Sequence, residues 1–124
     1  MVNKKIILLF HPSWAIRQVI KILLPEKLII DIFEKPDFLL EYDNVSPKLL
    51  ILGIGSGRGY AKITTQISNY AEYYSIPSIL IMDDVINYSI TKQPHNGTKI
   101  WIAKNRLHKS LVIATQLFVS LTDA

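Results

Sequence analysis

The chain alternates short, unbroken apolar runs with longer stretches whose apolar residues recur at helical spacing. The runs that we expect to form buried strands are residues 5–10, 28–33, 49–52, 78–82 and 99–103. Helical spacing covers residues 14–24, 60–74 and 107–121, and weaker signals predict short helices over 36–44 and 83–88 and a polar loop over 91–97. Five strands that alternate with helices predict an α/β domain with a five-stranded parallel sheet.

Each of the longer helices carries an apolar face, and the first has clear ends, because Ser13 can cap it and Pro25 stops it. The residues expected to pack on the sheet are Ile16, Val19, Ile20 and Leu23, then Ile63, Ile67, Tyr70, Ala71 and Tyr74, and finally Leu107, Leu111, Ala114, Phe118 and Leu121. Apolar residues beyond these faces are Trp14, Ile22, Val112, Ile113, Leu117 and Val119. Such an excess predicts a partner contact through the first and last helices, and the alternative is a wide buried stripe with scattered exposed residues.

Length and composition narrow the class of protein. A chain of 124 residues predicts a single domain over 1–124. It has no cysteine, which excludes a disulfide scaffold and any thiolate site. The net charge of +4 comes from scattered lysines, so we expect no direct contact with DNA. The apolar runs are far shorter than the ~20 residues of a membrane helix, and we therefore expect a cytoplasmic protein without membrane contact.

Glycines follow the third predicted strand, at Gly53, Gly55, Gly57 and Gly59. In α/β proteins this end of a strand opens onto the usual ligand crevice. Gly55, Gly57 and Arg58 are therefore candidates for binding an anion or nucleotide phosphate. Their spacing matches neither common phosphate-binding motif, and no acidic residue is expected to end the second strand and hold a ribose. Glycines are also what a sharply turning loop needs, or what is left where a functional side chain has been lost.

Four landmarks make the whole chain resemble the receiver domain of response regulators in bacterial two-component systems. They are ILLFHP at residues 7–12, SPKLLILG at 46–53, IPSILIM at 76–82 and NGTKIWIAK at 96–104. The first is similar to the branch that precedes a LuxR-type helix-turn-helix domain. The resemblance implies a flavodoxin-like (βα)5 fold, a three-layer sandwich, and a role in signal transduction and transcription regulation.

The chain departs from the receiver pattern at the residues that would carry phosphorylation. Leu9 and Phe10 stand where the family has a metal-binding acid pair, Gly53 stands at the phospho-accepting aspartate, and Met82 stands at the Thr or Ser switch. Trp101 is near the aromatic position, and Lys104 matches the family's lysine. Aspartyl phosphorylation needs a carboxylate and a Mg²⁺ held by oxygen ligands, so we expect no phosphorylation, no enzyme activity, no metal and no cofactor.

Three other polar positions each have two interpretations. Asp83 and Asp84 could bind a metal, but adjacent acids are more typical of a helix cap. His11 could be a general base, but with no partner assigned we expect a turn residue that hydrogen-bonds the backbone. Lys104 would pair with phosphate in an active receiver, whereas here we expect it to fill or hydrogen-bond the former pocket.

The sequence therefore predicts a degenerate receiver that signals by forming a homodimer or by binding a regulator protein. Either a LuxR-type DNA-binding domain follows Ala124 in a longer regulator, in which case DNA would be contacted only through that domain, or the module acts alone. The alternative function is a sensor for a small anion or nucleotide that uses the glycine-rich loop 53–59 together with Lys104.

Overall fold

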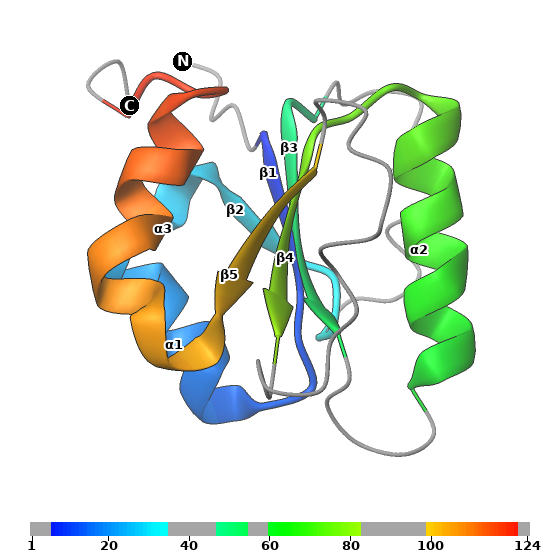
Figure 1. Ribbon diagram of the computed structural model, residues 1–124, viewed down its shortest axis with the longest axis horizontal. Helices are drawn as coiled ribbons and strands as arrows, with labels where there is room; N and C mark the ends of the chain where they lie inside the picture. Colours follow the sequence, from blue (N-terminus) through cyan, green and yellow to red (C-terminus); the bar gives the residue numbers. More distant parts are fainter. Residues whose placement is uncertain (1–5, 35–46, 55–59, 83–98, 122–124) are drawn as a thin grey trace.

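Five parallel strands form one sheet in the order β2-β1-β3-β4-β5 (Figure 1). The structure is a computed structural model that describes residues 6–34, 47–54, 60–82 and 99–121. The strands are β1 (Ile7–Phe10), β2 (Ile29–Asp31), β3 (Leu49–Ile54), β4 (Ser78–Met82) and β5 (Lys99–Ala103). The helices are α1 (Trp14–Leu23), α2 (Ala61–Tyr73) and α3 (Leu107–Gln116), with 3₁₀ turns at η1 (Glu26–Leu28) and η4 (Lys104–Arg106).

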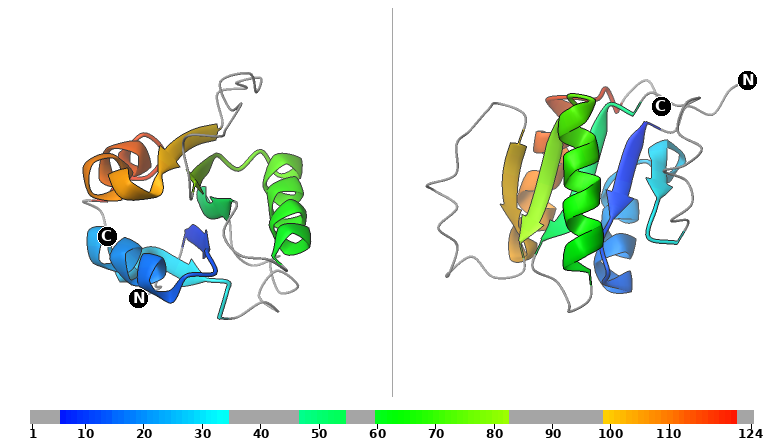
Figure 2. Two further views of the ribbon diagram at one scale, coloured as in Figure 1. Left: turned by 60° about the horizontal axis from the view of Figure 1, so that its bottom comes forward. Right: turned by 90° about the vertical axis from the view of Figure 1, so that its right-hand side faces the viewer.

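The helices cover both faces of this sheet. Figures 1 and 2 show α1 and α3 on one face and α2 on the other. The strand order is that of the flavodoxin-like fold. From β1 the chain adds β2 on one side and then crosses over to add β3 on the other side of β1, so the direction of winding reverses between β1 and β3. The predicted fold class, a flavodoxin-like three-layer sandwich with a five-stranded parallel sheet, is therefore confirmed.

Two apolar clusters fill the space between the layers. Alternate strand residues point to opposite faces, so Leu9 joins the cluster under α1 and α3, and Phe10 joins the cluster under α2. The central strands are buried on both faces, which explains why they appear in the sequence as unbroken apolar runs rather than as alternating patterns.

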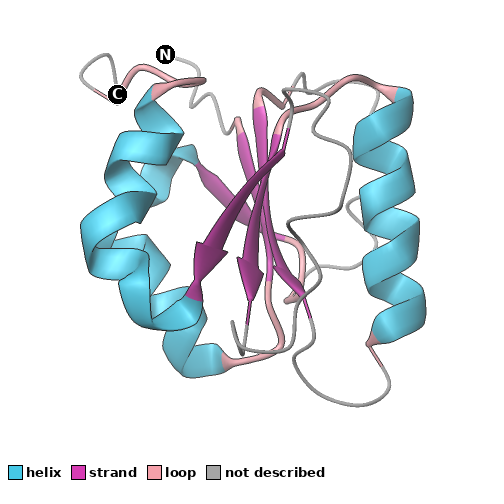
Figure 3. Cartoon of the chain, in the orientation of Figure 1, coloured by secondary structure: helices cyan, strands magenta, loops and turns pink. Residues whose placement is uncertain are grey.

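Local sequence signals explain where α1 begins. The Ser13 hydroxyl accepts a hydrogen bond from the Ile16 amide at 3.3 Å, which satisfies one of the free amides of the first turn. The helix ends before Leu24 and Pro25, within one residue of the predicted end. In the colouring of Figure 3 the same helix leads through a short loop and turn into β2.

The last helix is shorter than predicted, because it ends at Gln116 rather than near Leu121. The amides of Phe118 and Val119 both donate to the Thr115 carbonyl, at 3.0 and 2.9 Å, in a tight turn that closes the helix. Apolar spacing continued past this point in the sequence because Val119 still packs into the core after the helix has ended.

The packed face of α2 is also narrower than predicted. Ile67 and Ala71 are buried against the sheet, as expected, but Ile63 is 41% exposed and Tyr74 is 57% exposed. The Tyr74 ring packs instead against the rings of Tyr70 and Tyr73, at centroid distances of 4.7 and 4.9 Å. The helices predicted over 36–44 and 83–88, the loop over 91–97 and the acids Asp83 and Asp84 lie outside the described residues.

Candidate functional site

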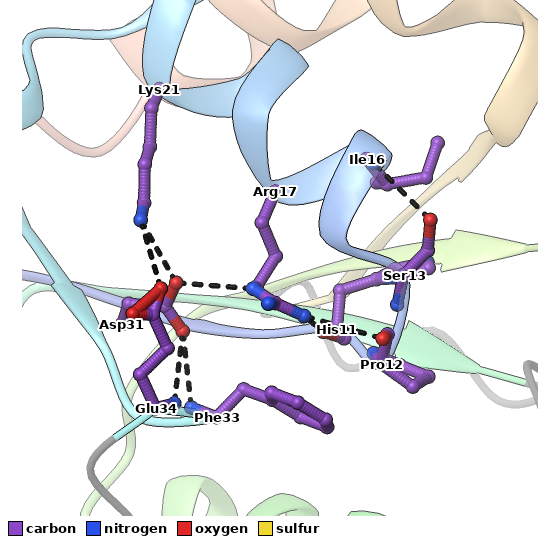
Figure 4. A network of polar contacts seen from close by, with 9 residues as sticks. All are labelled: His11, Pro12, Ser13, Ile16, Arg17, Lys21, Asp31, Phe33 and Glu34. Atoms are coloured by element: carbon purple, nitrogen blue, oxygen red, sulfur yellow. Dashed lines mark hydrogen bonds and ion pairs between the residues drawn. The ribbon is translucent and has the colours of Figure 1, made fainter.

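The carboxyl ends of β1, β2 and β3 lie together at the edge where the strand order reverses, which is the usual ligand crevice of this fold. Parallel pairing sets Leu9 opposite Asp31 and Phe10 opposite Leu52. The residues that follow these positions, His11 and Gly53, are both buried. Figure 4 shows the polar contacts that join this edge to α1.

His11 is a buried turn residue, with 1% of its surface exposed. Its Nδ1 accepts a hydrogen bond from the Ser13 amide at 3.0 Å. An accepting Nδ1 assigns the proton of the neutral ring to Nε2. The prediction that His11 hydrogen-bonds the backbone of a turn is confirmed, and its position two residues before the cap residue Ser13 links β1 to the start of α1.

The ring of His11 occupies the space that a side chain at position 53 would need. A Cβ built on Gly53 would lie 2.4 Å from His11 Cδ2 and 2.9 Å from both Cγ and Nε2. Contacts this short do not occur between packed atoms, so either the ring or the strand would have to move. The packing of the His11 ring therefore explains why position 53 holds a glycine in this fold. This explanation is separate from the missing carboxylate that the sequence pattern indicates.

Aromatic rings fill the other face of the same edge. Phe10 packs against Phe33 and Tyr60, with centroid distances of 5.4 and 6.4 Å, and Phe33 and Tyr60 are 5.6 Å apart. Ring pairs at these separations contribute about 0.5–1.5 kcal/mol each beyond the burial of their surface. A position where a metal-binding receiver would have an acid is thus part of an apolar cluster.

Arg17 reaches from α1 to the ends of both β1 and β2, and only 5% of the residue is exposed. Its Nη1 donates to the carbonyl oxygens of His11 at 2.8 Å and Pro12 at 3.2 Å. Its guanidinium carbon lies 4.4 Å from the centre of the Phe33 ring. Its Nε lies 3.2 Å from Asp31 Oδ2, an ion pair without the alignment of a hydrogen bond.

Asp31 receives the second cation of α1 as well. Lys21 Nζ lies 3.0 Å from Asp31 Oδ2 and 3.5 Å from Glu34 Oε1. The other oxygen, Asp31 Oδ1, accepts hydrogen bonds from the amides of Phe33 and Glu34, at 3.1 and 3.4 Å. Two cations and two amides therefore surround one carboxylate, whose interactions hold α1 against the end of β2.

Burial lowers the pKa of Lys21, but the hydrogen bond and charge of Asp31, followed by the charge of Glu34, outweigh it and leave that pKa above its ordinary 10.5. A pKa raised by folding means that the charged form stabilises the fold below pH 10.5 and that this contribution is lost as the pH rises through the folded value. Lys21 is thus a cation of the network throughout the neutral range.

The expectation that no acidic residue ends the second strand is wrong, because β2 ends at Asp31. The sequence prediction extended this strand to Phe33, which placed Asp31 inside it. Arg17 and Lys21, two cations four residues apart on a mostly apolar helix, were the available signal for a buried acid nearby. With its oxygens engaged as described, Asp31 is a structural residue at the position where a ribose ligand would be held.

The other residues at the positions that the receiver pattern assigns to the phosphorylation pocket do not converge. Leu9 is fully buried on the opposite face from Phe10, and Met82 is 5% exposed at the end of β4. Trp101 is half-buried against the cluster under α2. Lys104 is exposed as the first residue of η4, and its expected hydrogen bonding to this region stays a prediction.

The six candidate interface residues separate into two groups. Trp14, Ile22, Ile113 and Leu117 are 66%, 81%, 66% and 69% exposed. The prediction of Val119 as an interface residue is wrong, because the turn after α3 places its side chain in the core, where it is 3% exposed. Val112 is half-buried and packs against the same cluster.

Other sequence candidates are limited by what the structure describes. Gly55, Gly57 and Arg58 lie outside the described residues. Within the described ranges, no group of three His, Asp or Glu residues is placed to hold a metal ion. None of the helices in these ranges has the length and apolar character needed to cross a bilayer.

The contact between His11 and Gly53 predicts a specific stability effect. Gly53→Ala should lower the free energy of unfolding by about 1–3 kcal/mol, because the new methyl group overlaps the His11 ring. In a His11→Ala background the same substitution should cost much less, since the ring is gone. Urea unfolding of the four proteins measures both costs. Equal costs in the two backgrounds would contradict the contact.

Comparisons with protein-family models, with curated proteins and with solved structures find no significant match to this chain. The resemblance to receiver domains therefore rests on the four sequence landmarks, and the flavodoxin-like fold rests on the strand order and layers described above.

Proposed function

We propose that the chain is a receiver-like interaction module of a bacterial regulator that acts in the cytoplasm without being phosphorylated. It associates with a second copy or with a regulator protein. The landmarks of the sequence support the receiver part of this proposal, and the packing at the carboxyl edge supports the independence from phosphorylation. The exposed apolar residues of α1 support association, and they carry the proposal.

The residues at the carboxyl edge support independence from phosphorylation. Transfer to a carboxylate requires the nucleophile and a Mg²⁺ ion that neutralises the developing charge. Leu9, Phe10 and Gly53 supply neither, and the space beside Gly53 is taken by the His11 ring. Restoring an aspartate at position 53 would therefore also require His11 to move.

The outer side of α1 presents two large apolar residues to solvent. Trp14 and Ile22 are eight positions apart, which separates them by about 80° around the helix axis, so both lie in the outer half of α1. They face away from Ile20, which is buried in the core. Covering side chains of this size contributes about 1.5–3 kcal/mol each, which favours association through this side of the helix.

Sedimentation equilibrium tests self-association through α1. The wild-type chain should be dimeric at high micromolar concentration, and Trp14→Gln with Ile22→Gln should shift it to monomer by removing the apolar contact. The matched control is Ile63→Gln, which changes an exposed apolar residue of α2 on the other face of the sheet. A wild-type monomer at every concentration, or a dimer insensitive to the α1 pair, would contradict this mode of association.

Phosphorylation is tested separately with acetyl phosphate and Mg²⁺. Intact-mass spectrometry should find no added phosphoryl group, because no carboxylate stands at position 53, and a receiver domain that retains its aspartate serves as the positive control. A phosphoryl adduct on this chain would overturn the phosphorylation-independent account while leaving the association result unaffected.

A further inference from the structure

A groove of about 340 Å³ runs between β5 and the flank of α3, beside the buried face of the helix. Because α3 follows β5 directly through η4, the helix returns alongside the strand that it leaves (Figure 1). Among the described strands only β4 pairs with β5, so the groove lies at an edge of the sheet. Its main side chains on α3 are Arg106, Lys109, Ser110, Ile113 and Leu117, and its strand wall is Ile100 to Ala103.

The groove is basic at one end and apolar at the other. Arg106 and Lys109 are exposed at the start of α3, and neither makes an ion pair with a described residue. Ile113 and Leu117, about two-thirds exposed, follow at intervals of four residues along the same side of the helix. No acidic residue is among the described residues that line the groove.

The start of α3 reinforces the positive end. Its first turn has no acidic residue and no side-chain cap, although the partial positive charge of a helix start ordinarily favours an acid there. Arg106 and Lys109 instead add two full positive charges at this point. This arrangement is unfavourable by itself and becomes favourable when an anion lies in the groove.

We propose that the groove binds an amphipathic organic anion, a monocarboxylate with an apolar tail. Arg106 and Lys109 bind the carboxylate, and the tail covers Ile113, Leu117 and Ile100. The volume lies at the small end of the roughly 300–1,000 Å³ typical of ligand pockets, which favours a medium-chain fatty acid over a long one. This site is separate from Trp14 and Ile22 and stands independently of the proposed association.

The composition of the groove distinguishes this ligand class from two simpler ones. A compact anion such as inorganic phosphate would contact the two cations and leave the apolar end uncovered. A neutral apolar molecule would cover Ile113 and Leu117 and leave both cations without a partner. Only a ligand with both a negative charge and an apolar tail contacts the cations and the apolar side chains of the groove together. Removing either part of the ligand should therefore weaken its binding.

Titration of the ¹⁵N-labelled chain with decanoate, kept below the concentration at which it forms micelles, tests the proposal. Decanoate should cause saturable amide shifts concentrated in residues 100–103 and 106–117. Decanol and inorganic phosphate, which carry one feature each, should bind at least about tenfold more weakly. Shifts centred on Trp14 and Ile22 or on Tyr73 and Tyr74, no saturation, or equal binding of decanol would each overturn the site.

Substitutions separate the two halves of the groove. Arg106→Gln with Lys109→Gln should weaken decanoate binding about tenfold, because both charges that bind the carboxylate are removed. Ile113→Gln with Leu117→Gln should weaken it at least as much. The matched controls are Lys62→Gln and Ile63→Gln on α2, which should bind like the wild type, and the amide spectra report whether each variant is folded. Unchanged affinity in both groove variants would refute the assignment.

Discussion

The buried guanidinium of Arg17 is the constraint on which the carboxyl edge of this domain depends. It binds the carbonyls of His11 and Pro12, pairs with Asp31 and lies against the Phe33 ring. Only 5% of Arg17 is exposed, and a charge buried to this extent is tolerated only when it is paired and hydrogen-bonded. Removing one partner of such a pair typically lowers the free energy of unfolding by about 3–5 kcal/mol. These contacts fix α1 over the ends of β1 and β2 at once.

Fixing α1 in this way also fixes the turn that closes the edge. Arg17 holds the His11 carbonyl, the Ser13 amide holds the His11 ring, and the ring lies on Gly53. Among the described residues, the His11 ring fills the space beside Gly53, and Arg17 and Asp31 pair at the ends of β1 and β2. Both proposals arise from other described surfaces, the outer side of α1 and the groove beside β5.

Much of the fold could be predicted from the sequence, because strands buried on both faces leave unbroken apolar runs. The bounds of β4 and β5 match the prediction, and α1 begins at the residue after Ser13 as expected. The site was predicted less well. The pairing of Arg17 with Asp31 depends on the register that sets Leu9 opposite Asp31, which no local pattern contains. Val119 was predicted as an interface residue because helical spacing does not reveal that α3 ends in a turn at Thr115.

A double-mutant cycle on Arg17 and Asp31 measures whether these residues form one buried network at the ends of β1 and β2. Urea unfolding should show that Arg17→Met and Asp31→Leu each lower the free energy of unfolding by about 3 kcal/mol. The double variant should cost clearly less than the sum of the two single ones, because Arg17 and Asp31 contact each other directly, while Lys21 remains paired with Asp31 when Arg17 alone is replaced. Single variants within about 0.5 kcal/mol of the wild type, as expected for solvent-exposed charges, would contradict the account.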